Sequence, residues 1–167
     1  MKEKAVGINI SEGIIKVAII SKENEKVSIE GLEEVPFDSF DTLNEDKQVY
    51  EHIKKFLSKN RVSSNVFVSM PDDKVVVRVK TTPKLPEAKI LQIIHAEIKD
   101  YAIFSRENVT FGLVASREDN DSKLVVWSGA KEAEVVNISK FLRKCGIKTK
   151  NIMPSNVALA KYVSTFF

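Results

Sequence analysis

The stretch from Val6 to Ile20, VGINISEGIIKVAII, has the outline of a hairpin that grips phosphate. Its candidate nucleotide-binding residues are Asn9, Ser11, Gly13 and Lys16, and two of them favour an anion. Lys16 could neutralise phosphate, and Gly13 could supply an unusual backbone angle. The other two disfavour it, because Asn9 is a neutral and poor partner for a hard cation, and Ser11 adds a side chain where close backbone approach is needed.

The hairpin also contains Glu12, which would direct negative charge towards a phosphate. We therefore expect an ordinary turn, with a vestigial, inactive nucleotide site as the alternative. Elsewhere, His52 and His95 have no further ligand at zinc spacing, and Cys145 has no neighbouring His that would activate its thiol. The sequence thus predicts no catalytic residue and no metal site.

Charge and composition narrow the class of protein. The 167 residues include 26 Lys and Arg and 23 Asp and Glu, whose signs alternate overall, so a nucleic-acid partner is not expected. Charges at Lys2, Glu3 and Lys4 do not fit a secretory signal, and a single cysteine excludes an internal disulfide. We expect a cytoplasmic protein that does not insert into the membrane, because no apolar run approaches the ~20 residues that cross a bilayer.

Hydrophobic periodicity predicts alternating strands and helices. A helix capped by Asn44 follows three strands, and Pro86 opens a second helix. In the strand expected from residue 75, Val75, Val77 and Val79 occur at every second position. We therefore expect these valines to be buried, and Arg78 and Lys80 on the opposite face to be exposed to solvent. The expected strands are 4–10, 14–21, 25–34, 66–70, 75–79, 109–116, 123–129 and 147–153, and the expected helices are 44–60, 86–103, 131–144 and 155–166.

Three segments in this order resemble the PilM family of type IV pilus assembly proteins, in the FtsA-like branch of the actin-fold ATPases. The first is the opening VGINISEGIIKVAII. The second is VFVSMPDDKVVVRVKTTPKLPEAKILQIIHAEIKDYAIF, with its strand, proline turn, strand and acidic helix. The third is KLVVWSGAKEAEVVNISKFLRKCGIKTKNIMPSNVALAKYV. Together the three segments cover most of the chain.

The resemblance implies an α/β fold, an actin-like (ribonuclease H-like) half with an inserted small α/β subdomain. Residues 1–70 and 147–167 would form part of subdomain 1A, and residues 71–146 would form the inserted subdomain 1C. We expect Val75, Val77, Ile94 and Phe141 to lie in the core of 1C. Members of the family are longer, and their second phosphate loop, adenosine pocket and second lobe have no counterpart in this sequence.

The same resemblance implies a scaffold and not an enzyme. In the family, the groove between 1A and 1C receives the cytoplasmic N-terminal peptide of PilN, a bitopic inner-membrane protein. In this chain the crossings between the subdomains lie near Met70, Pro71, Met153 and Pro154, which we take as partner-binding candidates. The resemblance makes ATP and magnesium possible ligands of the full-length family, but we expect neither here.

Two further expectations belong to this hypothesis. The chain would lie at the periphery of the inner membrane through its partner. It could also self-associate through the 1A lobe, where Leu159, Val163, Phe166 and Phe167 occur near the end of the sequence. The alternatives are half of a split actin-fold ATPase or kinase-like enzyme, and the cytoplasmic domain of a GspL-type secretion protein.

Overall fold

The computed structural model describes residues 3–11, 13–24, 26–62, 66–104, 107–149 and 151–166. Glu12 and Phe167 therefore lie outside the described residues, and so does the side chain of Phe166. The chain forms two compact units. Unit 1 comprises Met1–Pro71 and Val136–Phe167, and unit 2 comprises Asp72–Val135.

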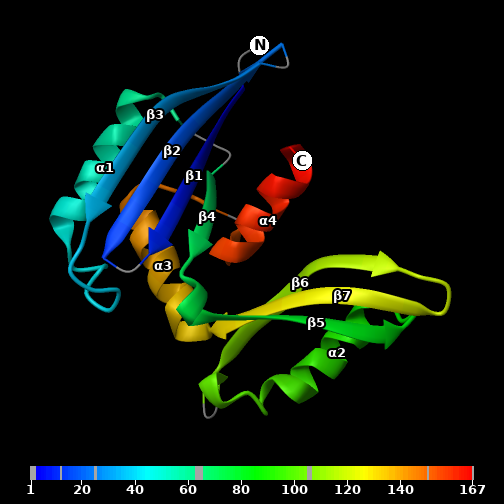
Figure 1. The fold of residues 1–167 in the computed structure, drawn as a ribbon. Helices are drawn as coiled ribbons and strands as arrows, with labels where there is room; N and C mark the ends of the chain where they lie inside the picture. The colour runs from blue at the N-terminus through cyan, green and yellow to red at the C-terminus, as the bar shows by residue number, and fades with distance from the viewer. Residues whose placement is uncertain are drawn as a thin grey trace. The chain divides into compact units, whose positions relative to one another are not determined.

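Unit 1 is built on a five-stranded mixed sheet with the order β3-β2-β1-β4-β8 (Figure 1). β1, β2 and β3 form an antiparallel meander, whereas β4 is parallel to β1 and β8 is parallel to β4. The strands are β1 (Glu3–Ser11), β2 (Ile14–Glu23), β3 (Lys26–Pro36), β4 (Val66–Met70) and β8 (Ile152–Pro154), and the helices are α1 (Lys47–Lys59), α3 (Glu132–Lys144) and α4 (Ser155–Phe166).

The two faces of this sheet differ in burial. Along β1 the alternation places Val6 and Ile8 in the core, while Gly7 points the other way, where an added Cβ would meet open space. Helix α1 covers the buried face, since a Cβ on Gly31 would lie 3.1 Å from the Phe56 ring. Helix α4 lies on the opposite face, which we call the open face, and covers only part of it (Figure 1).

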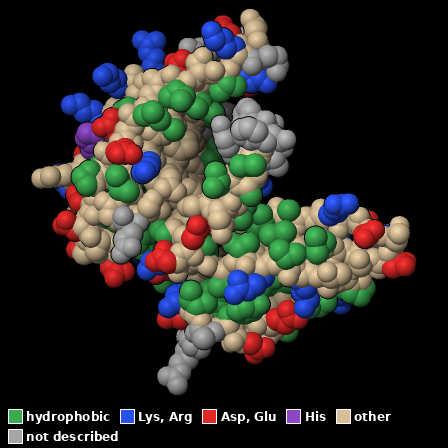
Figure 2. All heavy atoms as spheres, in the orientation of Figure 1, with side chains coloured by type: hydrophobic (Ala, Val, Ile, Leu, Met, Phe, Trp, Pro, Cys, Tyr) green, Lys and Arg blue, Asp and Glu red, His purple; other side chains and the backbone are tan. Residues whose placement is uncertain are grey.

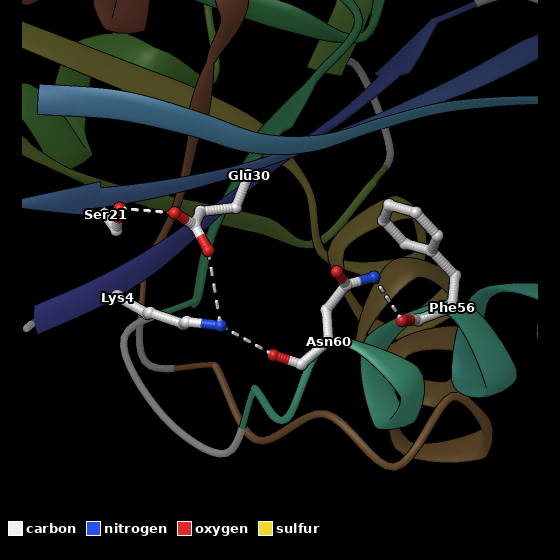
Figure 3. A network of polar contacts seen from close by, with 5 residues as sticks. All are labelled: Lys4, Ser21, Glu30, Phe56 and Asn60. Carbon is white, nitrogen blue, oxygen red and sulfur yellow. Dashed lines mark hydrogen bonds and ion pairs between the residues drawn. The ribbon is translucent and has the colours of Figure 1, made fainter.

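A polar network ties α1 to the meander on the buried face (Figure 3). Lys4 Nζ donates to the Asn60 carbonyl oxygen (3.0 Å) and lies 3.7 Å from Glu30 Oε2. The same carboxylate accepts from the buried Ser21 hydroxyl (2.9 Å), and Asn60 Nδ2 donates to the Phe56 carbonyl (2.9 Å). One lysine thus connects β1, β3 and the C-terminal end of α1.

Unit 2 is a three-stranded antiparallel sheet covered by one helix. Its strand order is β5-β7-β6, and a core of aliphatic residues closes around Trp127. Tyr101 packs edge-on against Trp127 with ring centroids 5.7 Å apart. The elements of unit 2 are β5 (Val75–Pro83), α2 (Glu87–Ile98), β6 (Val109–Glu118), β7 (Ser122–Lys131) and two short 3-10 turns, Asp72–Lys74 and Ala102–Phe104.

The burial predicted for β5 was wrong. Val76 is buried in the core of unit 2, whereas Val79 is 62% exposed. Arg78 and Lys80 lie on the helix-covered face because their heads find partners there: the Arg78 guanidinium lies 5.4 Å from the Tyr101 ring, and Lys80 pairs with Glu97. Long aliphatic stems let charged residues occupy a covered face while their heads reach polar or aromatic groups.

Three other expectations need correction. Ile94 lies in the unit 2 core as expected, but Phe141 is buried in unit 1. The cap of α1 is Asp46, whose side chain accepts from the Val49 amide (3.1 Å), because Asn44 instead donates to the Asn137 carbonyl (2.9 Å). The strand expected over 147–153 is only the three residues of β8. The expected limits of the subdomains, between residues 70 and 71 and between residues 146 and 147, stay a prediction. The two compact units of the structure divide after Pro71 and after Val135.

Among the residues that the structure describes, no helix is long and apolar enough to cross a bilayer.

Candidate binding site on the open sheet face

The hairpin between β1 and β2 closes with the geometry of a tight turn. Asn9 is paired with Lys16, and Ser11 with Ile14, across the two strands. Gly13 has φ of +74°, a left-handed conformation that favours glycine. Its carbonyl oxygen accepts from the Phe37 amide (3.0 Å), which links the turn to the chain just after β3.

The side chain of Asn9 is held by hydroxyl groups from other parts of unit 1. Its Nδ2 donates to Ser69 Oγ at the end of β4 and to Ser155 Oγ at the start of α4, both at 2.9 Å. Its Oδ1 accepts from Ser11 Oγ (2.5 Å), and Ser155 Oγ donates to the Met70 carbonyl (2.8 Å). Both amide hydrogens and the amide oxygen of Asn9 are therefore occupied within the chain.

Lys16 also has a partner on its own sheet. Its Nζ lies 3.6 Å from Glu34 Oε1 on β3, and both side chains are more than half exposed. Exposed pairs of this kind contribute little to stability and are screened by salt. Lys16 can therefore leave Glu34 for an incoming anion, but the carboxylate lowers the positive potential at this position.

A groove of about 360 Å³ runs beside the hairpin on the open face of unit 1. Its floor contains the small residues Gly7 and Ala18, and its walls include the exposed side chains of Leu32 and Phe67 together with Ala158 of α4. In Figure 2, hydrophobic side chains gather over the face of β2 and β3 seen in that view. The polar rim is formed by Asn9, Lys16, Glu34 and Ser69.

The four partner-binding candidates lie together at the ends of two neighbouring strands. In the parallel pairing of β4 and β8, Met70 is opposite Pro154, and Ser69 is opposite Met153. Met70, Pro71 and Pro154 are buried, whereas Met153 is half-buried and lines the groove. Of the four, Met153 is therefore the side chain that a ligand in this groove can touch.

His52, His95 and Cys145, which the sequence offered as possible ligands or nucleophiles, each contact other residues of the chain or are buried. His52 lies 2.7 Å from Glu33, and His95 stacks on Phe111 with ring centroids 5.7 Å apart. Burial, followed by the nearby Glu51 carboxylate, raises the pKa of Cys145 to about 12, so its thiol stays protonated at neutral pH. No group of three His, Cys, Asp or Glu side chains within the described ranges could hold a metal ion.

Sequence reasoning found the hairpin but missed the residues that complete the site. Ser69 lies near the end of β4 and Ser155 directly follows β8. Both are far from Asn9 in sequence, and only the parallel pairing of the strands brings their hydroxyls to it. Leu32 and Phe67 look like ordinary strand residues. A usable signal was present in the small Gly7 and Ala18, which alternate with buried residues and leave space on the other face.

Comparison with solved structures identifies the fold. The chain is similar to a structure described as a PilM–PilN type IV pilus biogenesis complex, with a TM-score of 0.71 and 16% identity over 96% of this chain. It is also similar to the cytoplasmic domain of EpsL, an inner-membrane component of the type II secretion system of Vibrio cholerae, with a TM-score of 0.63 and 13% identity over 91% of this chain. The fold is therefore the expected α/β, actin-like half with a smaller α/β unit inserted.

A third structure, from Bacteroides thetaiotaomicron, is described as a protein with an actin-like ATPase fold and unknown function. Its TM-score is 0.53, with 15% identity over 97% of this chain. The chain spans 50%, 57% and 56% of the lengths of these three structures. No model of a known protein family matches the chain, and no curated protein matches it either.

Proposed function

We propose that the chain is a scaffold, without catalytic activity of its own, in the inner-membrane complex of a type IV pilus or a related secretion system. Its partner is the cytoplasmic N-terminal peptide of a bitopic, PilN-like membrane protein. The chain works in the cytoplasm and reaches the membrane through this partner. The observation that carries the proposal is a largely apolar groove on a fold that is similar to the PilM–PilN structure along 96% of the chain.

We place the peptide in the groove on the open face of unit 1. A short extended segment can lie over the small Gly7 and Ala18 and set apolar side chains against Leu32, Phe67 and Met153. The Lys16 and Glu34 pair at the rim can separate to meet charges of either sign on the peptide. Such recognition needs neither a nucleotide nor a metal.

The occupied polar groups of the hairpin support a protein ligand over ATP. An actin-type site uses an Asp where this chain has Asn9, and here the Asn9 amide is bound to three hydroxyls. Magnesium prefers several oxygen ligands and water, which a neutral, engaged amide does not provide. We therefore propose that the chain binds neither ATP nor magnesium.

A fluorescently labelled peptide tests this function. The peptide is the cytoplasmic N-terminus of a PilN-like bitopic membrane protein, and fluorescence polarisation measures its affinity for the full chain. We expect micromolar binding that Phe67→Ala weakens about tenfold, the cost of about 1.4 kcal/mol. Val136→Ala is the matched control, because Val136 is 41% exposed, close to the 47% of Phe67, but lies on α3 and not in the groove.

Either of two results would refute the proposal: no binding at high peptide concentration, or equal weakening by both variants.

The second candidate function is half of a split actin-fold ATPase or kinase-like enzyme, and Gly13 and Lys16 are the residues that favour it. A third candidate function is that of the cytoplasmic domain of a GspL-type secretion protein, which would also be a scaffold with this class of fold. We also propose that two copies of the chain associate through the open face of unit 1 when the partner is absent.

A further inference from the structure

The charges of the chain are distributed unevenly between the two units. Unit 1 carries 16 Lys and Arg against 12 Asp and Glu, whereas unit 2 carries 10 against 11. Every acidic residue of unit 1 occurs at or before Glu51. The parts of unit 1 that follow, residues 52–71 and 136–167, contain ten Lys and Arg and no acidic residue. The alternation of signs along the sequence therefore fails in these two segments.

The two acid-free segments approach each other on the side of the sheet that the helices cover. Lys144, at the end of α3, donates to the Asn44 carbonyl oxygen before α1, and its Nζ lies 5.5 Å from the centre of the Tyr50 ring. The charges of Glu51 and Lys54 act on the Cys145 thiol just beyond α3. The first half and the middle of α1, up to Lys54 in the first acid-free segment, are thus neighbours of the end of α3.

Eight exposed basic side chains from these segments form what we call the basic face. Figure 2 shows Lys and Arg side chains along the edge where Figure 1 draws α1. The basic face consists of Lys54, Lys55, Lys59, Arg61, Lys140, Arg143, Lys144 and Lys148.

Little of this positive charge is neutralised by partners. Lys54 lies 3.8 Å from Glu51, with both side chains half exposed, and Lys144 is engaged with a backbone carbonyl and a ring. The other six make no ion pair with any residue in the described part of the chain. The nearby Glu33 is already held by His52 at 2.7 Å. The basic face therefore has a surplus of positive charge that is open to solvent.

We propose that the basic face binds the anionic headgroups of a phospholipid bilayer. Six of its eight residues are lysines, which are compact charges on flexible stems and suit a fluid layer of phosphates. Recognition of nucleic acid relies more on planar arginine forks and aromatic stacking, and the nearby Tyr50 ring is covered by Lys144. The charge complementarity thus favours a lipid surface over DNA or RNA.

Binding through the basic face is weak and electrostatic, and it involves only the surface of the bilayer. Each Lys or Arg close to an anionic leaflet favours the bound state by about fivefold, and the acids around α1 cancel part of this effect. The contact therefore orients unit 1 on the bilayer without inserting a segment. This inference does not depend on the proposed peptide partner, although a tethered partner would strengthen it through effective concentration.

Vesicle co-sedimentation of the full chain tests the basic face. The vesicles contain phosphatidylcholine alone or with about 30% phosphatidylglycerol, at about 0.05 M and about 0.5 M salt. One variant reverses four charges of the basic face, and the control reverses four exposed charges of unit 2, so that both have the same net charge. The test variant is Lys55→Glu, Lys59→Glu, Lys140→Glu and Lys148→Glu, and the control is Lys84→Glu, Lys89→Glu, Lys99→Glu and Arg117→Glu.

We expect the wild type to bind the anionic vesicles at low salt, and not the neutral ones, with binding lost at high salt. The test variant should lose at least about tenfold in bound fraction, whereas the control keeps most of its binding. Circular dichroism of each variant confirms that it is folded. Equal loss in both variants, or no binding by the wild type, would overturn the proposal. Tighter binding to a short DNA duplex than to the vesicles would also overturn it and assign the face to nucleic acid.

Discussion

The most informative residue of this protein is Asn9. The resemblance to actin-fold ATPases implies that Asn9 would stand where those proteins use a carboxylate to hold magnesium through water, whereas in this structure Asn9 works as a structural connector. Through Ser69 and Ser155 it joins β1 to the end of β4 and the start of α4. A side chain that satisfies three internal hydroxyls has no group left for a ligand, so its role is in the stability of unit 1.

Replacing Asn9 with leucine tests this role. Leucine is similar in size but leaves the hydroxyls of Ser11, Ser69 and Ser155 without their partner in a half-buried site. Orphaned polar groups of this kind cost about 1–3 kcal/mol, so we expect Asn9→Leu to lower the free energy of unfolding by about 2 kcal/mol. Urea denaturation followed by circular dichroism measures it. The same change at the exposed Asn120 should stay within about 0.5 kcal/mol, and an equal effect at both positions would refute the structural role.

At the scale of single elements, sequence patterns identified most of the strands and helices, and helix starts and strand faces were harder. Alternation alone assigned the wrong face of β5, because Arg78 and Lys80 reach Tyr101 and Glu97 across the helix-covered side. The start of α1 was misplaced because Asn44 makes a tertiary hydrogen bond to Asn137. Both errors have the same physical cause. In each case a polar side-chain group interacts with a residue distant in sequence, and this tertiary interaction outweighs the local sequence preference.

The network of Lys4 in Figure 3 gives an element-level prediction for unit 1. Lys4→Met keeps the aliphatic stem but removes the donor to Asn60 and the charge beside Glu30, both in a partly shielded position. We expect it to lower the free energy of unfolding by about 1.5–3 kcal/mol, as for a hydrogen bond to a charged group. Lys16→Met is the control, since the Lys16 and Glu34 pair is exposed and should contribute less than about 1 kcal/mol. A larger effect in the control would contradict this ranking.

In unit 2, two neighbouring glycines on β6 and β7 should respond differently to alanine. A Cβ on Gly129 would lie 2.9 Å from Ile98 Cδ1 and 3.4 Å from the Trp127 ring, in a filled core, whereas a Cβ on Gly112 would meet nothing within 4 Å. Overpacking typically costs about 1–3 kcal/mol, so Gly129→Ala should destabilise unit 2. The fluorescence of the buried Trp127 reports the transition directly. Gly112→Ala should leave the free energy of unfolding nearly unchanged. A larger destabilisation by Gly112→Ala than by Gly129→Ala would contradict this account of the packing.

At the scale of the whole molecule, the class of fold could be predicted from the sequence, but the candidate site could not. The order of elements and the resemblance led to the actin-like half, which the similarity to solved structures confirms. The groove could not be predicted because it depends on parallel pairing between β1, β4 and β8, which brings together residues more than 50 positions apart. The basic face is also a property of packing, since it forms only where α1 and α3 meet.

The open face of unit 1 leads to a prediction about association. Ile29 is 66% exposed and Leu32 is 64% exposed on neighbouring positions of the same face, beside the groove. Extended apolar surface of this kind marks an interface, so light scattering should show an apparent mass that rises with protein concentration. The double change Ile29→Ser and Leu32→Ser should return the chain to a monomer, whereas Leu124→Ser in unit 2 should not. A strict monomer at high concentration would refute the prediction.

The central claim is that this chain recognises a peptide without using a nucleotide. It is tested most directly by measuring the affinity of the full chain for the partner's N-terminal peptide, by fluorescence polarisation, with and without millimolar Mg-ATP. We predict the same micromolar dissociation constant in both conditions, because the hairpin's Asn9 amide is occupied by Ser11, Ser69 and Ser155. Peptide binding that appears only with Mg-ATP, or that Mg-ATP abolishes, would contradict the account.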